Sequence, residues 1–544
     1  MYFLAFPRFL CYLRNGTLNR MFMKVNKISL FLLVACLFSV ACGSAANYTR
    51  RYNPNAKSPL LDLPLEKRLE LARKYLKVDY YESNPYIEVL DAETGKWGLI
   101  DAGGAEVLPC IYDYISDFHE GYASVEIDGK CGFIDEDAKV VVPCKYDYSL
   151  SFNDGLATVC LNGKWGAVNG EGKEIIACVY NTELFFSDGM ALAGSLETGK
   201  YGYIDMQGKE VVPFKYDYTG PFIDGVACVA IVDGETERVG VIDRDGNEVV
   251  PCGRYNWIGN FLYGLAEVKL NGKCGFVDKS GKEVVPCIYD DGRAVSDSML
   301  MLKSDDKWGF LNNDGREGIP FLYDDAGAYS EELAAVCVGD KGGFIDKDNN
   351  TVIPFVYDDV DGFVDGIAVV YVDDKSGCID KKGKEIIPCR YDDVHYFRIW
   401  NPNNITDKGV LEVCKESRHR EKYGIVDVSG KTIVPCKYDD IDICSNGMFV
   451  VYKDCRFGLL DAEGKRLLKC DYDEIRLFAP DFFLVEDEEG MYGVYDVSGN
   501  LIVKAMYDDV RFLRDLGIFV CGTEEENGAF IRSYYDTYGN FLGN

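Results

Sequence analysis

Residues 156–166 read Leu-Ala-Thr-Val-Cys-Leu-Asn-Gly-Lys-Trp-Gly, and residues 275–290 read Gly-Phe-Val-Asp-Lys-Ser-Gly-Lys-Glu-Val-Val-Pro-Cys-Ile-Tyr-Asp. Both segments hold short apolar runs separated by turn residues such as Asn162-Gly163. Such runs are typical of short β-strands. An Asn-Gly pair favours a two-residue hairpin turn, because both positions tolerate positive φ angles. The two segments therefore predict antiparallel strands joined by tight turns.

The same pattern recurs along the chain. A glycine that follows an aromatic or similar residue returns at spacings of 34, 34, 36, 38, 35, 34, 34, 34, 47, 34 and 35 residues. The twelve anchor glycines are Gly98, Gly132, Gly166, Gly202, Gly240, Gly275, Gly309, Gly343, Gly377, Gly424, Gly458 and Gly493. This regularity identifies a repeat architecture. A modular fold also suits 544 residues, which exceed the size of one ordinary core.

The turn after each anchor glycine has its own signature. An Asp or Asn lies three residues after the anchor in all twelve units, from Asp101 to Asp496. In ten units a Gly follows three residues later, with Ala138 and Asn349 as the exceptions. Asp at the first position and Gly at the fourth suit a type I turn that leads into a left-handed residue. Turn geometry therefore explains these acidic residues.

The last strand of each unit typically reads Glu-Val-Val-Pro-Cys-Lys-Tyr-Asp. Its Pro cannot donate a ladder hydrogen bond, so this strand is expected at an edge or a bulge. The next position holds Cys in eight units and Phe214, Phe321, Phe355 or Ala505 in the others, which predicts a buried packing position. Tyr closes the strand in all twelve units. A Tyr buries its ring while its hydroxyl finds a partner, so we expect a Tyr spine along the repeats.

Three units carry the tripeptide Lys-Trp-Gly, which ends at Gly98, Gly166 and Gly309. In this feature the chain resembles the WG (KWG) repeat family, over about residues 85–510. Other residues replace Trp in the remaining nine units. The resemblance implies an all-β repeat protein of a kind often exported from bacteria, with no established biochemical activity. It supplies no catalytic residues to carry over.

The spacing predicts an all-β tandem array of about twelve three-stranded units. We expect an open solenoid or superhelix, because about 34 residues are few for the four strands of a propeller blade. One or two β-propellers are the alternative. An open stack must cover its terminal apolar face. Residues 60–84 are expected to do so as an N-terminal helical cap, because Pro64 suits a first helical turn and the leucines that follow share one face.

The N-terminal residues have the features of an export signal. Lys24 and Lys27 precede an apolar run too short to span a bilayer comfortably, which predicts a signal peptide over residues 1–42 with Met23 as an alternative start. Ser39-Val-Ala-Cys42 resembles a bacterial lipobox, which implies lipidation of Cys42; Cys36 is the alternative. Cleavage after Ala45 or Ala46 and secretion also remain open. Residues 43–59 are expected to be a tether.

The remaining boundaries follow from the register of the units. Repeats 1–9 are expected over residues 85–393, an insertion over 394–416, repeats 10–12 over 417–510, and a degenerate C-terminal repeat or cap over 511–544. Insertions on a repeat scaffold map to loops, which often carry recognition. Aromatic residues outside the consensus are therefore the candidate binding residues: Trp257, Phe397 and Trp400.

Composition excludes several classes of function. A net charge of −31 repels phosphates, so nucleic acid is not expected as a partner. The three histidines, His119, His395 and His419, are far apart in sequence, so no metal site, cofactor or His-based catalysis is expected. Acidic pairs such as Asp290-Asp291 recur in many units and are interpreted as solvated turns.

We therefore expect a non-enzymatic repeat scaffold that binds a protein or polysaccharide partner at the bacterial cell envelope. Contact with the membrane is expected through a lipid anchor only, as an outer-membrane or cell-surface lipoprotein; a periplasmic or secreted protein is the alternative. The competing hypothesis is a glycoside-acting hydrolase built on a propeller, which requires acidic residues from several units to converge. The sequence leaves the oligomeric state and the identity of the ligand open.

Overall fold

A computed structural model describes residues 57–234, 236–399, 408–417, 420–524 and 530–544. Residues 53–544 form one compact unit. In the described part of this unit, the strands form thirteen four-stranded antiparallel sheets, each built from four consecutive strands. We call these sheets blades 1 to 13, from β1–β4 to β49–β52. Two short 3-10 helices, η1 (Pro59–Asp62) and η2 (Arg514–Leu516), and one α-helix, α3 (Leu65–Lys74), complete the described elements.

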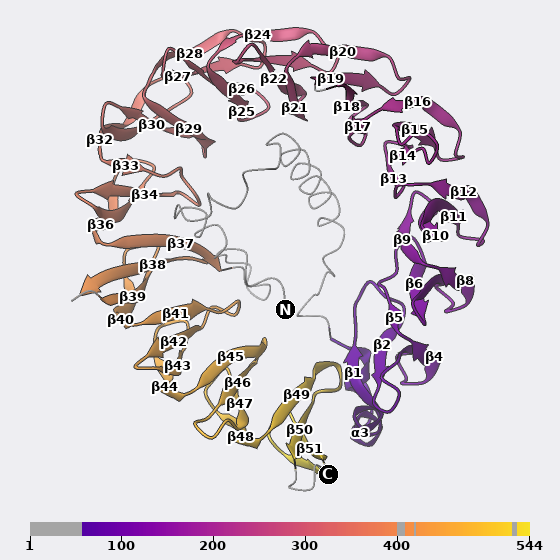
Figure 1. The fold of residues 1–544 in the computed structure, drawn as a ribbon. Coiled ribbons are helices and arrows are strands. Elements are labelled where there is room, and N and C mark those ends of the chain that lie inside the picture. Colours follow the sequence, from indigo (N-terminus) through magenta and orange to yellow (C-terminus); the bar gives the residue numbers. More distant parts are fainter. Residues whose placement is uncertain (1–56, 235, 400–407, 418–419, 525–529) are drawn as a thin grey trace. The chain divides into compact units, whose positions relative to one another are not determined.

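In each blade the first strand lies nearest the middle of the ring and the second lies beside it (Figure 1). The first strands are β1 (Tyr75–Asp79), β5 (Tyr114–Ile115), β9 (Tyr148–Asn153), β13 (Phe185–Ser187), β17 (Tyr218–Thr219), β21 (Trp257–Leu262), β25 (Asp291–Ala294), β29 (Asp325–Ser330), β33 (Asp359–Val360), β37 (Asp393–Ile399), β41 (Asp440–Ile443), β45 (Glu474–Ala479) and β49 (Asp509–Leu513). The second strands are β2 (Ile87–Asp91), β6 (Tyr122–Ile127), β10 (Leu156–Leu161), β14 (Met190–Gly194), β18 (Val226–Asp233), β22 (Leu265–Leu270), β26 (Met299–Ser304), β30 (Leu333–Val338), β34 (Ile367–Val372), β38 (Lys408–Ser417), β42 (Phe449–Lys453), β46 (Phe482–Glu486) and β50 (Ile518–Glu524).

The third and fourth strands form the outer half of each blade. The third strands are β3 (Trp97–Ile100), β7 (Lys130–Asp135), β11 (Lys164–Asn169), β15 (Tyr201–Asp205), β19 (Thr236–Asp243), β23 (Lys273–Asp278), β27 (Lys307–Asn312), β31 (Lys341–Ile345), β35 (Lys375–Asp380), β39 (Arg420–Asp427), β43 (Arg456–Leu460), β47 (Tyr492–Asp496) and β51 (Phe530–Asp536). The fourth strands are β4 (Glu106–Tyr112), β8 (Val140–Tyr146), β12 (Glu174–Tyr180), β16 (Glu210–Tyr216), β20 (Glu248–Tyr255), β24 (Glu283–Tyr289), β28 (Glu317–Tyr323), β32 (Thr351–Tyr357), β36 (Glu385–Tyr391), β40 (Thr432–Tyr438), β44 (Arg466–Tyr472), β48 (Leu501–Tyr507) and β52 (Phe541–Gly543).

The architecture corrects the prediction of three-stranded units in an open solenoid and supports the propeller alternative. The missed strand is the first of each blade. It is short, with two residues each in β5, β17 and β33, and its sequence lacks the alternation that marks the other three strands. The segment between the closing Tyr of one unit and the next apolar run therefore gives no local strand signal.

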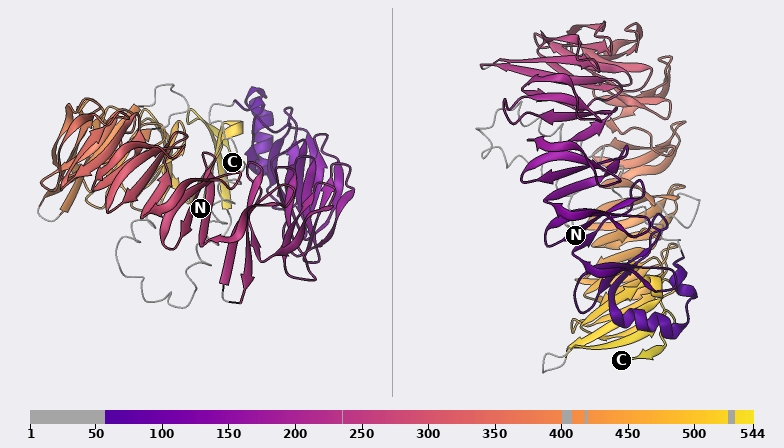
Figure 2. Two further views of the ribbon diagram at one scale, coloured as in Figure 1. Left: turned by 90° about the horizontal axis from the view of Figure 1, so that it is seen from above. Right: turned by 90° about the vertical axis from the view of Figure 1, so that its right-hand side faces the viewer.

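The first and last blades contact each other, so the series of blades closes into a ring. Leu71 of α3 and Val78 of β1 belong to one buried cluster with Ile518 and Val520 of β50. Figure 2 shows α3 beside the C-terminal blade. The predicted helical cap is thus α3, but it ends at Lys74, and it packs where the two ends of the ring meet and covers no open end.

The anchor glycine permits a close crossing of backbones inside each blade. A Cβ placed on Gly132 would lie 2.4 Å from the Val142 carbonyl oxygen and 2.7 Å from the Cys144 backbone nitrogen. The fourth strand therefore passes directly over the third at a register shift, and only a residue without a side chain fits there. Pro143 lies on this outermost strand, as predicted.

The Cys position, predicted as a buried packing position, is half-buried. The Cys144 thiol donates to the Val125 carbonyl oxygen at 3.7 Å. Burial raises the pKa of this thiol. The closing tyrosines pack between blades: Tyr146 of blade 2 shares a cluster with Phe152 and Val159 of blade 3. All eighteen cysteines in the described residues are free thiols.

A repeated ion pair holds an aspartate that in turn bonds to the next blade. In nine cases a Lys or Arg at the start of the third strand pairs with the residue that follows the closing Tyr, seventeen positions later. The pairs are Lys96–Asp113, Lys130–Asp147, Lys200–Asp217, Lys273–Asp290, Lys307–Asp324, Lys341–Asp358, Lys375–Asp392, Lys422–Asp439 and Arg456–Asp473. The second carboxylate oxygen of Asp290 accepts the Asp305 backbone N–H of the next blade at 2.9 Å. We call this arrangement the latch.

The predicted turns are confirmed. Asp128 and Gly129 have φ angles of 52° and 71°, as the two-residue hairpin requires. The Asp135 carboxylate accepts the backbone N–H groups of Asp137 and Lys139 at 3.0 and 2.9 Å. The turn acids therefore bind their own backbone.

Candidate functional site

The residue that opens each first strand varies around the ring, whereas the core residues repeat. It follows the latch residue, and in most blades it pairs with the second-strand residue twelve positions later, as Tyr148 does with Cys160. At this shared register it is aromatic in blades 2, 3, 5 and 6 and acidic in blades 7 to 13; β1 and β13 open at a different register, with Tyr75 and Phe185, and are left out of the comparison. The residues compared are Tyr114, Tyr148, Tyr218, Trp257, Asp291, Asp325, Asp359, Asp393, Asp440, Glu474 and Asp509.

Acidic side chains gather on three consecutive blades, 9 to 11. We define the acidic cluster as Asp359, Asp361, Asp393, Glu412, Asp440 and Asp442, with His395 among them. The His395 Nε2 atom lies 2.9 Å from an Asp393 carboxylate oxygen. The Tyr371 hydroxyl donates to Asp361 at 3.3 Å. Strands β33, β37, β38 and β41 therefore bring carboxylates from three repeats together.

The cluster perturbs the titration of its members. Burial, together with the charges of Asp440, Asp393 and Asp442, raises the pKa of Glu412 to about 7, although His395 opposes the shift. Burial likewise raises the pKa of Asp361, and the neighbouring acids add to the effect. A carboxyl group with a pKa near 7 exchanges protons at neutral pH. Glu412 is therefore the group in this cluster best suited to proton transfer.

Trp257 is held in a fixed position on β21. The residue is 39 % exposed, and the Lys269 ammonium lies 5.4 Å from the ring centroid. The six-membered half of the indole lies against Gly259, where an added Cβ would approach the ring to 2.7 Å. The glycine thus makes room for the ring, and one part of the indole remains open to solvent.

The structure does not bring the predicted binding residues together. Phe397 lies on β37 and is 41 % exposed, but β37 belongs to blade 10 and Trp257 to blade 6. Trp400 lies outside the described residues, and so do both candidate lipidation sites, Cys42 and Cys36. The segment predicted as an insertion includes the long hairpin of β37 and β38.

Sequence reasoning missed the acidic cluster because it interpreted the Asp-Asp pairs as solvated turns. That interpretation describes only the first residue of each pair, which lies in a bend. In the pair Asp439-Asp440 the first residue is a latch aspartate and the second opens a strand. Glu412 could have been singled out from the sequence. Most other units have an uncharged residue at its position, such as Ser124, Thr158 or Met301.

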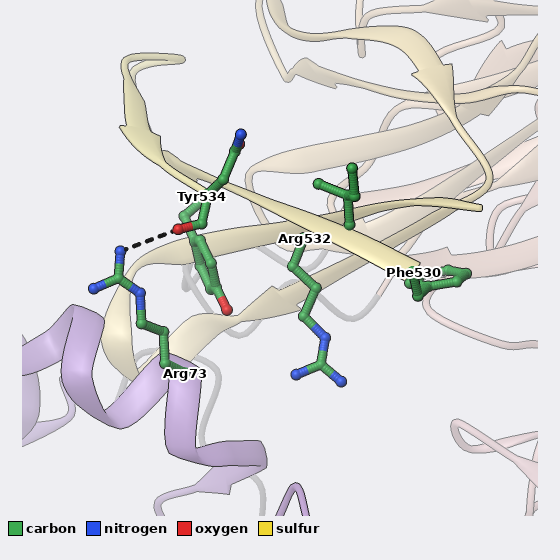
Figure 3. Close-up of a pocket in the computed structure, with 6 residues that line it drawn as sticks. Arg73, Phe530, Arg532 and Tyr534 are labelled. Atoms are coloured by element: carbon green, nitrogen blue, oxygen red, sulfur yellow. Dashed lines mark hydrogen bonds between the residues drawn. The ribbon is translucent and has the colours of Figure 1, made fainter. Parts of the chain in front are cut away.

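An open pocket of about 340 Å³ lies at the ring closure (Figure 3). Arg73 of α3 and Phe530, Ile531, Arg532, Tyr534 and Asn544 of the last blade line it. Arg73 donates to the Asn544 carbonyl oxygen at 3.4 Å and lies 5.5 Å from the Tyr534 ring centroid. These contacts hold α3 against blade 13. The pocket is therefore part of the junction between the two ends of the ring.

Two further properties apply to the described residues only. Within these ranges, no set of three or more His, Cys, Asp and Glu side chains is arranged to hold a metal ion. No described helix is long and apolar enough to cross a lipid bilayer.

Comparison with known families gives one match. The model described as WG containing repeat matches residues 97–131, 132–165, 165–193, 201–234, 240–274, 275–308, 308–341, 343–375, 377–398, 423–454 and 492–520. These segments cover more than half of the chain. No curated protein sequence matches.

Solved structures resemble the chain only distantly. A eukaryotic initiation factor is 12 % identical, with a TM-score of 0.27 over 59 % of this chain and 95 % of its own. The tricorn protease is 10 % identical, with a TM-score of 0.21 over 85 % and 61 % of the two chains. Hsv2p of Kluyveromyces lactis is 10 % identical, with a TM-score of 0.22 over 44 % and 92 %.

Proposed function

The chain belongs to the WG-containing repeat family, and on this premise we propose that it is a non-enzymatic scaffold that binds a protein or polysaccharide at the bacterial cell envelope. One observation carries the proposal. The core and latch residues repeat from blade to blade, whereas the residues that open the first strands differ and are largely exposed. The repeated residues maintain the fold. Recognition of a partner is therefore expected at the exposed positions that vary from blade to blade.

The net charge of the protein favours some classes of binding partner over others. The net charge of −31 disfavours nucleic acids and other polyanions. Exposed aromatic rings and carboxylates suit sugars, which offer apolar C–H faces and hydroxyl donors, and basic polypeptides. The proposal therefore includes these two partner classes and excludes a nucleic-acid partner.

A capture experiment tests the binding function. The full-length protein, immobilised at its C-terminus, is incubated with envelope extract and with a panel of envelope polysaccharides at physiological salt. We expect at least one saturable partner whose retention falls when Trp257 or the acidic cluster is changed. Retention that none of these substitutions alters, or no saturable retention at all, overturns the proposal.

The envelope location rests on the N-terminal residues. Lys24, Lys27 and the apolar run before Cys42 support export, and the lipobox resemblance supports an anchor at Cys42, with Cys36 as the alternative. In bacteria fed a labelled fatty acid, we expect the protein to carry the label and Cys42→Ala to remove it, while Cys36→Ala keeps it. Release of unlabelled protein into the periplasm or medium favours secretion instead.

A specific observation favours a second function, glycoside hydrolysis at the acidic cluster. A general acid must be protonated at the working pH while a neighbouring carboxylate stays ionised. Glu412, with a pKa of about 7, fits the acid, and Asp393 and Asp440 are nearby carboxylates. Release of reducing sugar from a polysaccharide panel, lost in Glu412→Gln, identifies this activity. Equal hydrolysis by the variant and the wild type rules out the assignment of Glu412.

A further inference from the structure

The first strands divide the ring into an uncharged arc and a charged arc. In blades 2, 3, 5 and 6 the opening residue is aromatic, and the residue two positions later is uncharged: Ser116, Leu150, Gly220 and Gly259. In blades 7 to 13 every opening residue is acidic, and six of these seven blades also carry a charged or ionisable residue two positions later: Arg293, Asp361, His395, Asp442, Arg476 and Arg511. The side chains two apart on a strand share one face, so the contrast belongs to one surface.

The uncharged arc presents exposed aromatic rings at one register position. Tyr114, Tyr148 and Tyr218 are 49 %, 51 % and 52 % exposed, and Trp257 is 39 % exposed. An aromatic residue at a strand opening normally buries most of its area if it serves the core. These four rings lie in equivalent places, as their pairing with Glu126, Cys160, Ala230 and Lys269 on the second strands shows. The arc thus carries four similar platforms, one in each of blades 2, 3, 5 and 6, and blade 4 lacks a ring at this register.

Two of the rings are held by defined contacts. Gly259 leaves the space that the Trp257 indole occupies, and Lys269 lies 5.4 Å from its centroid. Tyr148 meets Trp165 of its own blade edge to face, at a centroid distance of 5.8 Å. Fixed rings lose little conformational entropy on binding, which favours them as contact surfaces.

We propose that this arc, Tyr114, Tyr148, Tyr218 and Trp257, binds a neutral polysaccharide by stacking. The negative face of an aromatic ring attracts the positive C–H groups on the apolar face of a sugar. A polymer of similar sugars offers such faces repeatedly, which suits platforms that recur at one register in four blades. This inference rests on the proposed binding function, and it specifies the class of partner and the surface that binds it.

Charge selects the class of polysaccharide. A polyanionic chain is repelled by the net charge of −31 and by the charged arc. A basic polypeptide is drawn toward the acidic opening residues of blades 7 to 13 and away from the uncharged arc. The lack of charge at the opening positions of blades 2, 3, 5 and 6 therefore favours a ligand that is itself uncharged.

The test compares three soluble polymers by affinity electrophoresis and isothermal titration with the full-length protein. The probes are a neutral glucan series, polygalacturonate and poly-lysine. We expect at least one neutral glucan to bind. We expect Trp257→Ala to weaken that binding at least tenfold, because the indole offers the largest stacking face of the four rings.

Two further variants separate stacking from general damage. Gly259→Ala keeps every aromatic residue but places a Cβ 2.7 Å from the indole, so we expect it to weaken binding as Trp257→Ala does. Tyr538→Ala removes an aromatic side chain that is 85 % exposed and lies outside the arc, and it should leave binding unchanged. Circular dichroism and thermal unfolding establish that each variant is folded.

The possible results of these binding experiments separate failure of the glucan-binding inference from failure of the proposed scaffold function. Glucan binding that Trp257→Ala and Gly259→Ala leave unchanged overturns the inference. Binding of poly-lysine or an envelope protein with no binding of any neutral glucan also overturns it, and the scaffold function then stands. No partner from either the glucan series or the envelope extract overturns both.

Discussion

The Lys273 ammonium lies 2.5 Å from one Asp290 carboxylate oxygen, and the other oxygen accepts the Asp305 backbone N–H at 2.9 Å. Lys273 and Asp290 belong to blade 6 and Asp305 to blade 7. One side chain therefore joins the hairpin turns of two neighbouring blades. This contact gives a physical reason for two regular features of the repeat, the Lys before the anchor glycine position and the Asp after the closing Tyr.

Asp290→Ala should lower the urea midpoint of unfolding, and Asp290→Asn should lower it less. An amide oxygen still accepts a backbone N–H, as Asn256 does from Asn271 at 2.7 Å in the preceding blade. The effect is expected to be small, because exposed ion pairs contribute little. Equal midpoints for both variants and the wild type would contradict the latch. The matched control is Asp297→Ala, an exposed aspartate in the turn between β25 and β26 of blade 7.

Acid should weaken many latches within one pH range. The paired lysines lower the pKa of Asp147, Asp217, Asp324 and Asp358 below that of an ordinary Asp. A carboxyl group with a lowered folded pKa contributes stability above its unfolded pKa, about 3.9, and this stability is lost as the pH falls through the folded value. We expect the unfolding temperature to fall steeply below about pH 4. A flat profile between pH 5 and pH 2 would contradict this expectation.

Glu412 should have the opposite pH dependence. Its folded pKa is raised from 4.5 to about 7, so the folded state loses stability as the pH rises through this window. Glu412→Gln is expected to be more stable than the wild type at pH 8 by on the order of 2 kcal/mol and to differ little at pH 4. Chemical unfolding at both pH values measures the difference. A gain of the same size at both would show that Glu412 is not shifted.

Leu71→Ala should open the ring at its closure. Leu71 is 2 % exposed and packs between α3 and the first and last blades, and Leu→Ala in such sites costs about 2–5 kcal/mol. We expect faster hydrogen exchange in β1 and β50 than in the other blades. Leu311→Ala, equally buried in the cluster between blades 6 and 7, is the control and should leave this exchange pattern at the closure unchanged.

Gly132→Ala tests the crossing of strands. The added Cβ meets the Val142 carbonyl oxygen at 2.4 Å, and overpacking of this kind costs about 1–3 kcal/mol. Gly220→Ala is the control, because nothing lies within 4 Å of its Cβ position. Its expected change in the free energy of unfolding is within about 0.5 kcal/mol. Similar losses from both substitutions would remove the steric explanation.

The sequence predicted much of the blade because its signals are local. The turn at Asp135 and the hairpin at Asp128-Gly129 depend on residues a few positions apart, and both were predicted. The first strands could not be predicted from local pattern, because residues such as Tyr114-Ile115 become a strand only by pairing with β6. Ring closure depends on contacts between α3 and β50, which are more than 400 residues apart in sequence.

The candidate site was predicted only in part for the same reason. Trp257 and Phe397 differ from the repeat consensus, so they were found as single residues. The acidic cluster depends on three blades placing Asp361, His395 and Asp442 next to one another, and no single unit shows this. The division of the ring into two arcs becomes visible only when the opening residues are compared at equal register.

The latch has a consequence for how such proteins change in length. Nine units offer a Lys or Arg and an Asp of their own at the same places, and the Asp accepts a turn N–H of the next unit, as Asp290 does from Asp305. A unit copied by gene duplication therefore arrives with complementary contacts for whichever units flank it. Such a ring can gain or lose units during evolution without the invention of a new junction.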